Sequence, residues 1–384
     1  MRGKVSSMSG GRTAIVLTGG GARGAYQAGA VLAIAEITRQ RVLPFPVLAG
    51  SSAGSISAAY LASRADEFPA AARDLADLWT TLSAHDVYRT DSPTIAKTAA
   101  VWLADLSLGG WIGPGHGIAL LDTSPLRVLL DRHFDARALG HQVAAGRVHG
   151  IGITATNYES GNAVTFFEGA SSIEPWNRVT RVGTRQRIEV RHVLASAAIP
   201  LFFPAVDIDG AWYADGCIRL VTPLSPAIRL GGDRVIAVAV RAAAPAPRPL
   251  SSQHPSPAAT AGMLLDALFL DALEADIERT ERINHTLSLV PAALIEGHFT
   301  ALHPVSVLLL RPSVDPAALV LRVIERIPAP VRHLFLGLGA SEQAGWDLLS
   351  YLAFDGTYTS RLLDLGYEDT IARAEEIERF LEER

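Results

Sequence analysis

The sequence has a single cysteine and no long apolar segment. Cys217 stands alone in 384 residues, so no intrachain disulfide can form and a structural metal site built from cysteines is excluded. No uninterrupted apolar stretch approaches the roughly 18–20 residues that span a bilayer. The first twelve residues lack the apolar core of a signal peptide. We therefore expect a cytoplasmic protein, for which any contact with the inner membrane surface is peripheral.

Lysine is also scarce, since Lys4 and Lys97 are the only two. The formal net charge is -5, which argues against nucleic acid as the main partner. A hydrophobic fraction of 49% and a charged fraction of 19% indicate a compact globular protein rather than a disordered chain. The length suffices for one large α/β domain or two ordinary ones.

Short apolar runs, glycine turns and helical patterns alternate at the start of the chain. Strands are predicted at 14–17 and 45–49, and each is followed by a glycine turn and a helix, at 25–36 and 55–62. Later patterns predict strands over 148–157, 163–168, 234–240, 286–290 and 305–310, a hairpin over 206–214 that turns at Gly210, and helices over 69–83, 193–200, 263–284 and 367–384.

Three segments carry weaker patterns. We interpret the arginine-rich segment 177–191 as a surface loop and the Ala/Pro/Ser-rich segment 241–262 as a linker or loop. The loose apolar stretch 85–117 is consistent with a lid over a groove or with ordinary packing. The predicted organisation is a catalytic domain over 13–240, the linker, and a mainly helical C-terminal region over 263–384 that packs on it.

Two glycine motifs follow the first two predicted strands. One is Gly19-Gly20-Gly21-Ala22-Arg23-Gly24, whose free N–H groups at a helix start suit an anion. The other is Gly50-Ser51-Ser52-Ala53-Gly54, in which glycines fix a sharp strand-to-helix turn that exposes the Ser52 hydroxyl. Either motif alone is weak evidence. Together they supply a nucleophile and an oxyanion hole, which acyl transfer requires.

A serine nucleophile needs a base, and none of the eleven histidines lies in a diagnostic setting. Asp215 in Tyr213-Ala214-Asp215-Gly216-Cys217 follows a predicted strand and sits at a glycine turn. That position places a carboxylate at the edge of the sheet where Ser52 also lies. From the residue types alone, a simple Asp-Gly turn is equally consistent.

These motifs, with Ser196-Ala197-Ala198-Ile199-Pro200 and Phe203-Pro204 between them, occur in the order found in patatin-like phospholipases. The resemblance covers residues 13–240 and extends more weakly to Arg282-Ile283-Asn284 and Leu365-Gly366-Tyr367. It implies a three-layer α/β/α sandwich with a mixed central sheet plus C-terminal helices. It also implies a lipid acyl hydrolase that needs neither a metal nor another cofactor, with a lipid or related acyl ester as its substrate.

The resemblance assigns roles by position. Ser52 would be the nucleophile and Asp215 the base of a dyad without histidine. The oxyanion loop would contain Gly19, Gly20, Gly21 and Arg23, the elbow Gly50 and Gly54, and the dyad turn Gly216. Arg23 would stabilise an oxyanion or a lipid phosphate, or would only pair with an acid.

Two positions depart from the family pattern. Cys217 stands where glycine or alanine is usual, and Thr18 stands where aspartate or serine is frequent. Cys217 is small enough for a tight turn, so we expect reduced tolerance there and retained activity.

Three alternatives stay open. Gly19-x-Gly21-x-x-Gly24 also matches a dinucleotide fingerprint. However, no acid lies between Glu36 and Asp66, and only Arg39 and Arg41 would support an NADP version. An α/β-hydrolase triad would need His285, His298 or His333. The third alternative is a non-enzymatic lipid-binding protein on the same fold.

Overall fold

The computed structural model describes residues 11–91, 93–98, 100–101, 104, 119–243, 254, 256–269, 271–291, 302–339 and 346–382. Ten strands of this described chain form one mixed sheet in the order β10-β9-β1-β2-β3-β4-β6-β5, with β8 on β3 and β7 on β8. Their bounds are β1 Arg12–Leu17, β2 Val47–Ser51, β3 Gly150–Asn157, β4 Ala163–Gly169, β5 Trp176–Arg178, β6 Arg181–Arg185, β7 Val206–Ile208, β8 Ala211–Asp215, β9 Gly232–Val238 and β10 Ser306–Leu310.

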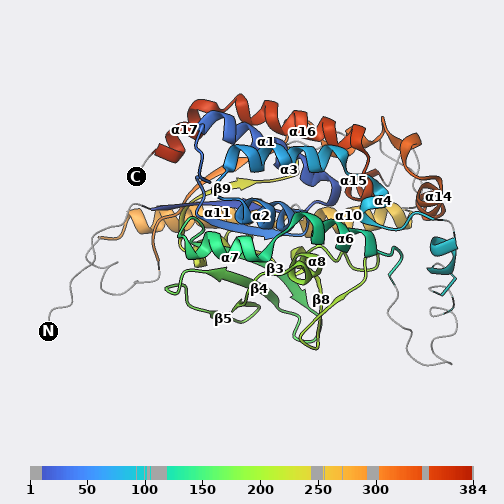
Figure 1. Cartoon of the computed structure of the whole chain (residues 1–384), viewed down its shortest axis with the longest axis horizontal. Helices are drawn as coiled ribbons and strands as arrows, with labels where there is room; N and C mark the ends of the chain where they lie inside the picture. The colour runs from blue at the N-terminus through green and yellow to red at the C-terminus, as the bar shows by residue number, and fades with distance from the viewer. Residues whose placement is uncertain are drawn as a thin grey trace.

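Helices cover both faces of this sheet (Figure 1). The α-helices are α1 Gly24–Thr38, α2 Ala53–Ser63, α3 Phe68–Thr81, α4 Ala84–Val87, α6 Ser124–His133, α7 Ala136–Ala144, α8 Val190–Ser196, α9 Ser225–Arg229, α10 Pro257–Phe269, α11 Asp271–Ser288, α13 Pro316–Val320, α14 Ala329–Gly337, α15 Trp346–Leu352, α16 Gly356–Ile371 and α17 Ala374–Glu382. The 3-10 turns are η1 Gly21–Arg23, η2 Gly216–Ile218 and η3 Ile324–Arg326. The predicted three-layer α/β/α sandwich with a mixed sheet is confirmed.

Strand β1 shows why the sheet is covered on both sides. Its apolar residues point alternately to the two faces of the sheet, and all of them are buried, so both faces must be covered. Ile15 and Leu17 belong to the large core that contains α1, α2 and α3. Ala14 and Val16 belong to a smaller core with residues of α9 and α11.

The C-terminal residues complete both the sheet and one helical layer. Strand β10 pairs in parallel with β9, which pairs in parallel with β1. Helix α16 crosses α1 so closely that a methyl group on Gly366 would lie 2.0 Å from the carbonyl oxygen of Tyr26. The division into domains at residues 240 and 263 stays a prediction about folding units.

Several predicted elements are confirmed, including the strands around residues 14–17, 163–168 and 305–310. The hairpin over 206–214 is β7 and β8, with Gly210 at a φ of 86° in the turn. The helix predicted over 193–200 ends at Ser196, ahead of Pro200. Most of 85–117, considered as a lid, lies outside the described residues.

Two predictions for loops and strands are wrong, and a third is wrong in part. Residues 177–191 are not a surface loop, because β5, β6 and the start of α8 occupy them. Pairing of β6 with the edge of β4 outweighs the polar composition. Residues 286–290 are not a strand, because α11 continues to Ser288. The predicted linker already contains the start of α10 at Pro257.

The single helix predicted over 263–284 corresponds to parts of α10 and α11. Two of the acids in this segment, Asp266 and Asp276, form hydrogen bonds within the protein. Asp266 accepts a hydrogen bond of 2.7 Å from the Tyr351 hydroxyl, and buried Asp276 accepts one of 3.0 Å from the Leu224 N–H. Among the described residues, none of the helices is both long and apolar enough to cross a membrane.

We predict that Gly366→Ala destabilises the fold by about 2–3 kcal/mol, because the added methyl group forces α1 and α16 apart. The matched control is Gly337→Ala, since a methyl group there meets nothing within 4 Å. Urea unfolding of both variants measures the difference. An equal effect of the two substitutions would contradict the close crossing.

Candidate active site

The glycine motifs and Asp215 meet at one edge of the sheet. Strands β1, β2 and β3 run parallel, so they end at this common edge, which we call the active edge. It lies to the right in Figure 1, where α4, α6, α8, α10 and α15 gather. A methyl group on Gly19 would lie 2.8 Å from the Cβ of Ser52 and 2.5 Å from the Sγ of Cys217.

Ser52 occupies a strained turn between β2 and α2. Its φ of 51° and ψ of -129° lie in a region that residues with a Cβ rarely adopt. The Ser52 N–H donates to the Ser196 hydroxyl at 3.0 Å, and this hydroxyl donates to the Thr154 carbonyl at 2.6 Å. Ser196 therefore ties the turn to β3.

Two predicted glycines allow this turn to pack against β1. A methyl group on Gly54 would lie 2.1 Å from the Leu17 carbonyl oxygen, and one on Gly50 would lie 2.6 Å from the Gly54 carbonyl oxygen. Both contacts are far below van der Waals distance. The start of α2 therefore lies directly beside the end of β1, where its dipole favours negative charge on Ser52.

Asp215 is fully buried at the end of β8. Its Oδ1 accepts the Cys217 N–H at 2.9 Å, whereas Oδ2 has no full hydrogen bond among the described residues. Burial raises the pKa of Asp215 from 3.8 to about 7, and hydrogen bonding from Ser52 and from Cys217 partly opposes this rise. The Ser52 hydroxyl therefore lies close enough to influence the carboxylate without completing a well-aligned hydrogen bond to Oδ2 among the described residues.

The two residues after Asp215 hold its turn in place. A methyl group on Gly216 would lie 2.0 Å from the Thr154 carbonyl oxygen, so the turn lies against β3. Burial and the neighbouring carboxylate raise the pKa of the Cys217 thiol. The protonated thiol donates to the Ser51 hydroxyl at 3.4 Å. The Cys217 side chain, which departs from the family pattern, thus fills the space between the glycine loop and the turn at Ser52.

The first glycine motif forms a turn held by neighbouring elements. Arg23 N–H donates to the Gly20 carbonyl at 3.1 Å, and Gly21 has a φ of 55°. Within the described residues, the N–H groups of Gly20 and Gly21 have no acceptor. The Gln27 amide donates to the Thr18 carbonyl at 2.8 Å and to the Val238 carbonyl at 3.1 Å, which fixes the start of the loop.

The Arg23 side chain extends away from this loop into the C-terminal helices. Its guanidinium donates to Ser350 at 2.9 and 2.6 Å and lies 4.1 Å from the ring centre of Tyr351. Asp266 and Asp347 lie 3.7 and 3.9 Å away. Arg23 therefore pairs with acids in this structure, rather than pointing toward a place where an oxyanion or a lipid phosphate would bind.

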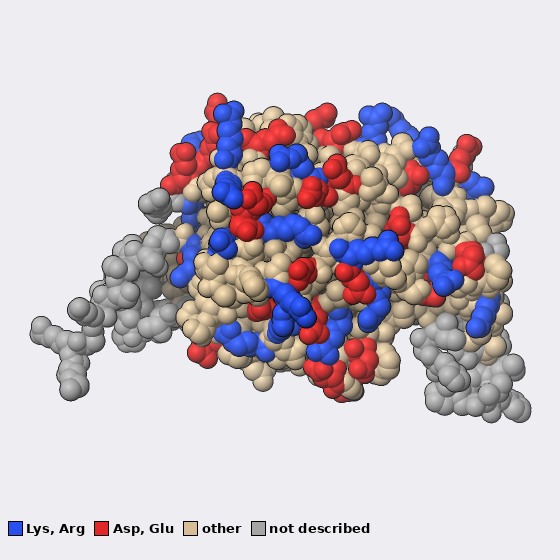
Figure 2. Space-filling model, viewed as in Figure 1, with Lys and Arg blue, Asp and Glu red and all other residues tan. Residues whose placement is uncertain are grey.

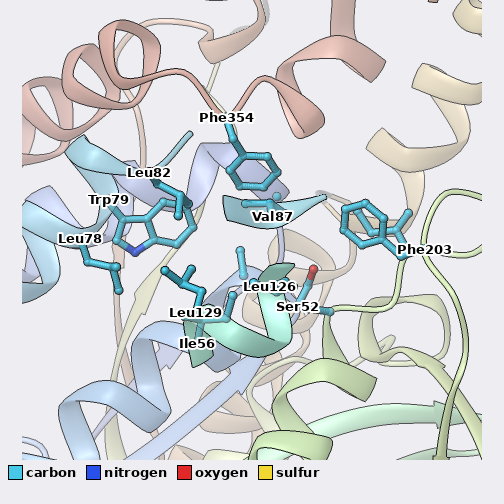
Figure 3. Close-up of a pocket in the computed structure, with 14 residues that line it drawn as sticks. Ser52, Ile56, Leu78, Trp79, Leu82, Val87, Leu126, Leu129, Phe203 and Phe354 are labelled. Atoms are coloured by element: carbon cyan, nitrogen blue, oxygen red, sulfur yellow. The ribbon is translucent and has the colours of Figure 1, made fainter. Parts of the chain in front are cut away.

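A narrow apolar pocket opens beside Ser52. Figure 3 shows Ser52 at one side, with Trp79, Leu82 and Phe354 among the side chains around the space. The other lining residues are Gly21, Ala53, Ile56, Leu78, Val87, Leu126, Leu129, Ala197, Ile199 and Phe203. The pocket thus offers a hydrocarbon chain a nearly continuous apolar wall.

The histidines considered for a triad do not approach this site in the described chain. No described histidine lines the pocket beside Ser52. His285 and His333 are exposed on α11 and α14, and His298 lies outside the described residues. No group of three His, Cys, Asp or Glu side chains within the described chain could hold a metal ion.

Sequence reasoning missed four supporting side chains. Ser196 was visible only as part of the Ser-Ala-Ala-Ile-Pro motif, without its role in holding Ser52. Gln27 lies inside a helical pattern that gives no hint of its two carbonyl partners. Ser350 and Phe354 are more than 290 residues from Ser52 in sequence, and local patterns carry no information on such contacts.

Comparison with known proteins gives one family. The model for patatin-like phospholipase matches residues 15–228, more than half of the chain. None of the curated proteins matches.

Among solved structures, VipD from Legionella pneumophila is 12% identical, with a TM-score of 0.32 over 93% of this chain and 67% of that chain. The type III effector protein ExoU is 16% identical, with a TM-score of 0.32 over 94% of this chain. The chain spans 54% of the length of ExoU.

We predict that Ser52→Gly is more stable than Ser52→Ala by about 1–2 kcal/mol, because only glycine relieves the strain at a φ of 51°. Both variants lack the hydroxyl, so the comparison isolates the backbone. Urea unfolding at one pH measures the difference. Equal stability, or a more stable alanine variant, would contradict strain at this turn.

We also predict that Asp215→Asn stabilises the fold increasingly as pH rises. Ionising Asp215 costs more in the fold than in the unfolded chain, because the folded pKa is about 7 against 3.8. The stabilising effect is absent below pH 3.8, grows above it, and levels off above pH 7 at up to about 4 kcal/mol. Unfolding of both proteins at pH 5 to 8 tests this, and a constant difference would contradict it.

Proposed function

The chain belongs to the patatin-like phospholipase family, and on that premise we propose that it is a serine hydrolase of lipid acyl esters that works through Ser52 and Asp215. The observation that carries the proposal is the strained Ser52 facing the buried Asp215 carboxylate beside an apolar pocket. A structural serine has no need of a strained turn, an ionisable neighbour and a hydrophobic space together.

In the first step, Asp215 accepts the hydroxyl proton while the Ser52 Oγ bonds to the ester carbonyl carbon. The raised pKa of Asp215 makes it a stronger base than an exposed aspartate and matches it to neutral pH. The carbonyl oxygen gains the negative charge, which the N–H groups of Gly20 and Gly21 would hold. Loss of one such donor typically costs about 3–4 kcal/mol of barrier.

In the second step, the carbon–oxygen bond to the alcohol breaks, and the alcohol leaves with the proton from Asp215. The acyl group is now an ester of Ser52. A water molecule then gives a proton to Asp215 and its oxygen to the acyl carbon. The fatty acid leaves, the proton returns to the Ser52 oxygen, and no cofactor is consumed.

The apolar lining of the pocket supports an acyl chain as the part of the substrate that binds there. Trp79 and Phe354 supply large apolar surfaces, and Ile56 and Leu129 line the same space (Figure 3). Burying each methylene group contributes about 0.8 kcal/mol. Esters with longer acyl chains should therefore bind more tightly until the pocket is full.

We expect a fluorophosphonate probe to label the wild-type protein and to leave Ser52→Ala unlabelled. The probe should label Asp215→Asn at least 100-fold more slowly than the wild type, because the serine has lost its base. The same variant should hydrolyse p-nitrophenyl butyrate at least 100-fold more slowly. Above the pKa of about 7 the wild-type kcat/KM should reach its plateau, and it should fall at lower pH as Asp215 is protonated.

The controls separate the alternatives. His285→Ala, His298→Ala and His333→Ala should retain full activity, whereas loss in one of them would indicate a triad. No labelling of a well-folded wild-type protein would leave a lipid-binding protein on a hydrolase fold.

A further inference from the structure

Exposed apolar side chains from four separate segments come together at the active edge. They are Tyr158, Val179, Trp212 and Val221, with 53%, 96%, 52% and 59% of their surface exposed. Single exposed apolar residues are ordinary in soluble proteins. A group that different loops bring to one edge of the sheet is unusual, and this is the edge at which Ser52 and Asp215 lie.

Strand registers and hydrogen bonds place these segments side by side. Tyr158 follows the last residue of β3, and its N–H donates to the Trp212 carbonyl at 2.9 Å. Val179 lies in the turn between β5 and β6, and the next residue, Thr180, accepts the Ala163 N–H at 2.9 Å at the start of β4. That start pairs with the end of β3, so the turn lies at the same edge.

The fourth segment joins through two arginines. Arg219 Nε donates to the Gly161 carbonyl at 2.7 Å, in the turn that follows Tyr158. The Arg181 guanidinium donates to the hydroxyl of Thr222, the residue after Val221. Because Val221 lies only six residues after Asp215, this segment connects the apolar group directly to the candidate base.

Arginines accompany these apolar residues. Arg178 and Arg219 are exposed and Arg181 is half-buried. Burial, followed by repulsion from Arg178 and Arg181, lowers the pKa of Arg229, as expected where positive charges gather. Two exposed acids also lie here: Glu159 in the turn after β3, and Asp207, which pairs with Trp212 between β7 and β8. We call the seven residues Tyr158, Val179, Trp212, Val221, Arg178, Arg181 and Arg219 the active-edge patch.

Three arginines against the two acids Glu159 and Asp207 give the patch a small positive excess, unlike the chain as a whole. The formal net charge of the chain is -5, and Figure 2 shows basic and acidic side chains interspersed over one broad face. Tryptophan and tyrosine with apolar neighbours suit the boundary between headgroups and acyl chains. Arginines at the same level suit anionic phosphates.

We propose that the active-edge patch is the surface with which the protein contacts an anionic phospholipid membrane. The inference rests on the proposed function, because it places the membrane where Ser52 and Asp215 would receive a lipid ester. The apolar residues enter the interface and the arginines bind phosphate oxygens. The substrate would enter from the same edge of the sheet at which Ser52 and Asp215 lie.

The test compares binding to vesicles of phosphatidylcholine alone and of phosphatidylcholine with phosphatidylglycerol. Val179→Ser/Trp212→Ser should weaken sedimentation with anionic vesicles about tenfold. The matched control, Val42→Ser/Leu302→Ser, should bind as the wild type does. Val42 and Leu302 are similarly exposed apolar residues that precede β2 and β10 at the opposite edge.

Charge is tested separately. Arg178→Gln/Arg219→Gln should weaken binding to anionic vesicles by about five-fold per arginine and should reduce its salt dependence. Arg39→Gln/Arg147→Gln, which removes two exposed arginines from the opposite edge, should have no such effect. Val179→Trp should strengthen binding to anionic vesicles, because tryptophan favours the membrane interface. Val179 is 96% exposed, so the substitution should not disturb the fold.

Hydrolysis of soluble p-nitrophenyl butyrate keeps the two proposals distinct. All patch variants should retain it while losing hydrolysis of vesicle lipid. If the wild type lacks soluble activity but binds vesicles through the patch, the catalytic proposal fails and the membrane proposal stands. Absence of wild-type vesicle binding, or equal losses in patch and control variants, would overturn the membrane proposal. A dimer that Val179→Asp dissociates would assign the patch to self-association and overturn it too.

Discussion

The buried Asp215 carboxylate is the constraint on which the arrangement of the active edge depends. A desolvated carboxylate with one oxygen lacking a full hydrogen bond opposes folding, and the fold holds it in place through its backbone. Its N–H donates to the Ala198 carbonyl and its carbonyl accepts the Thr156 hydroxyl, both at 2.8 Å. Strands β3 and β8 therefore fix a group that would otherwise leave the interior.

Ser52 is likewise held through its backbone and through neighbouring residues, and not through its own hydroxyl. Ser196 ties its N–H to β3, and Gly54 brings α2 against β1. The strained backbone thus aims the hydroxyl while leaving it free of strong hydrogen bonds. Strain and desolvation are both unfavourable for stability, and both serve the chemistry that we propose.

The sequence predicted the parts of the site that local chemistry determines. Gly50, Gly54 and Gly216 mark places where backbones approach too closely for a side chain, and each lies in a recognisable motif. The fold class followed from strands that alternate with helices and from the family resemblance. Errors arose where long-range pairing decides the outcome: β6 is a strand because the edge of β4 pairs with it, although its residues are polar. The environment of Arg23 was equally hidden, because Ser350 and Tyr351 are distant in sequence.

The contact between Arg23 and the C-terminal helices also concerns the order in which the chain is made. When the ribosome has released residues up to 240, Ser52 and Asp215 are both present. Ser350 and Tyr351, which hold Arg23 beside the glycine loop, and Phe354, which lines the pocket, have not yet been synthesised. The nascent chain therefore lacks part of its glycine-loop support and pocket wall until residues 350–354 emerge. A chain built this way completes the pocket beside Ser52 only when residues about 300 positions further along have been synthesised.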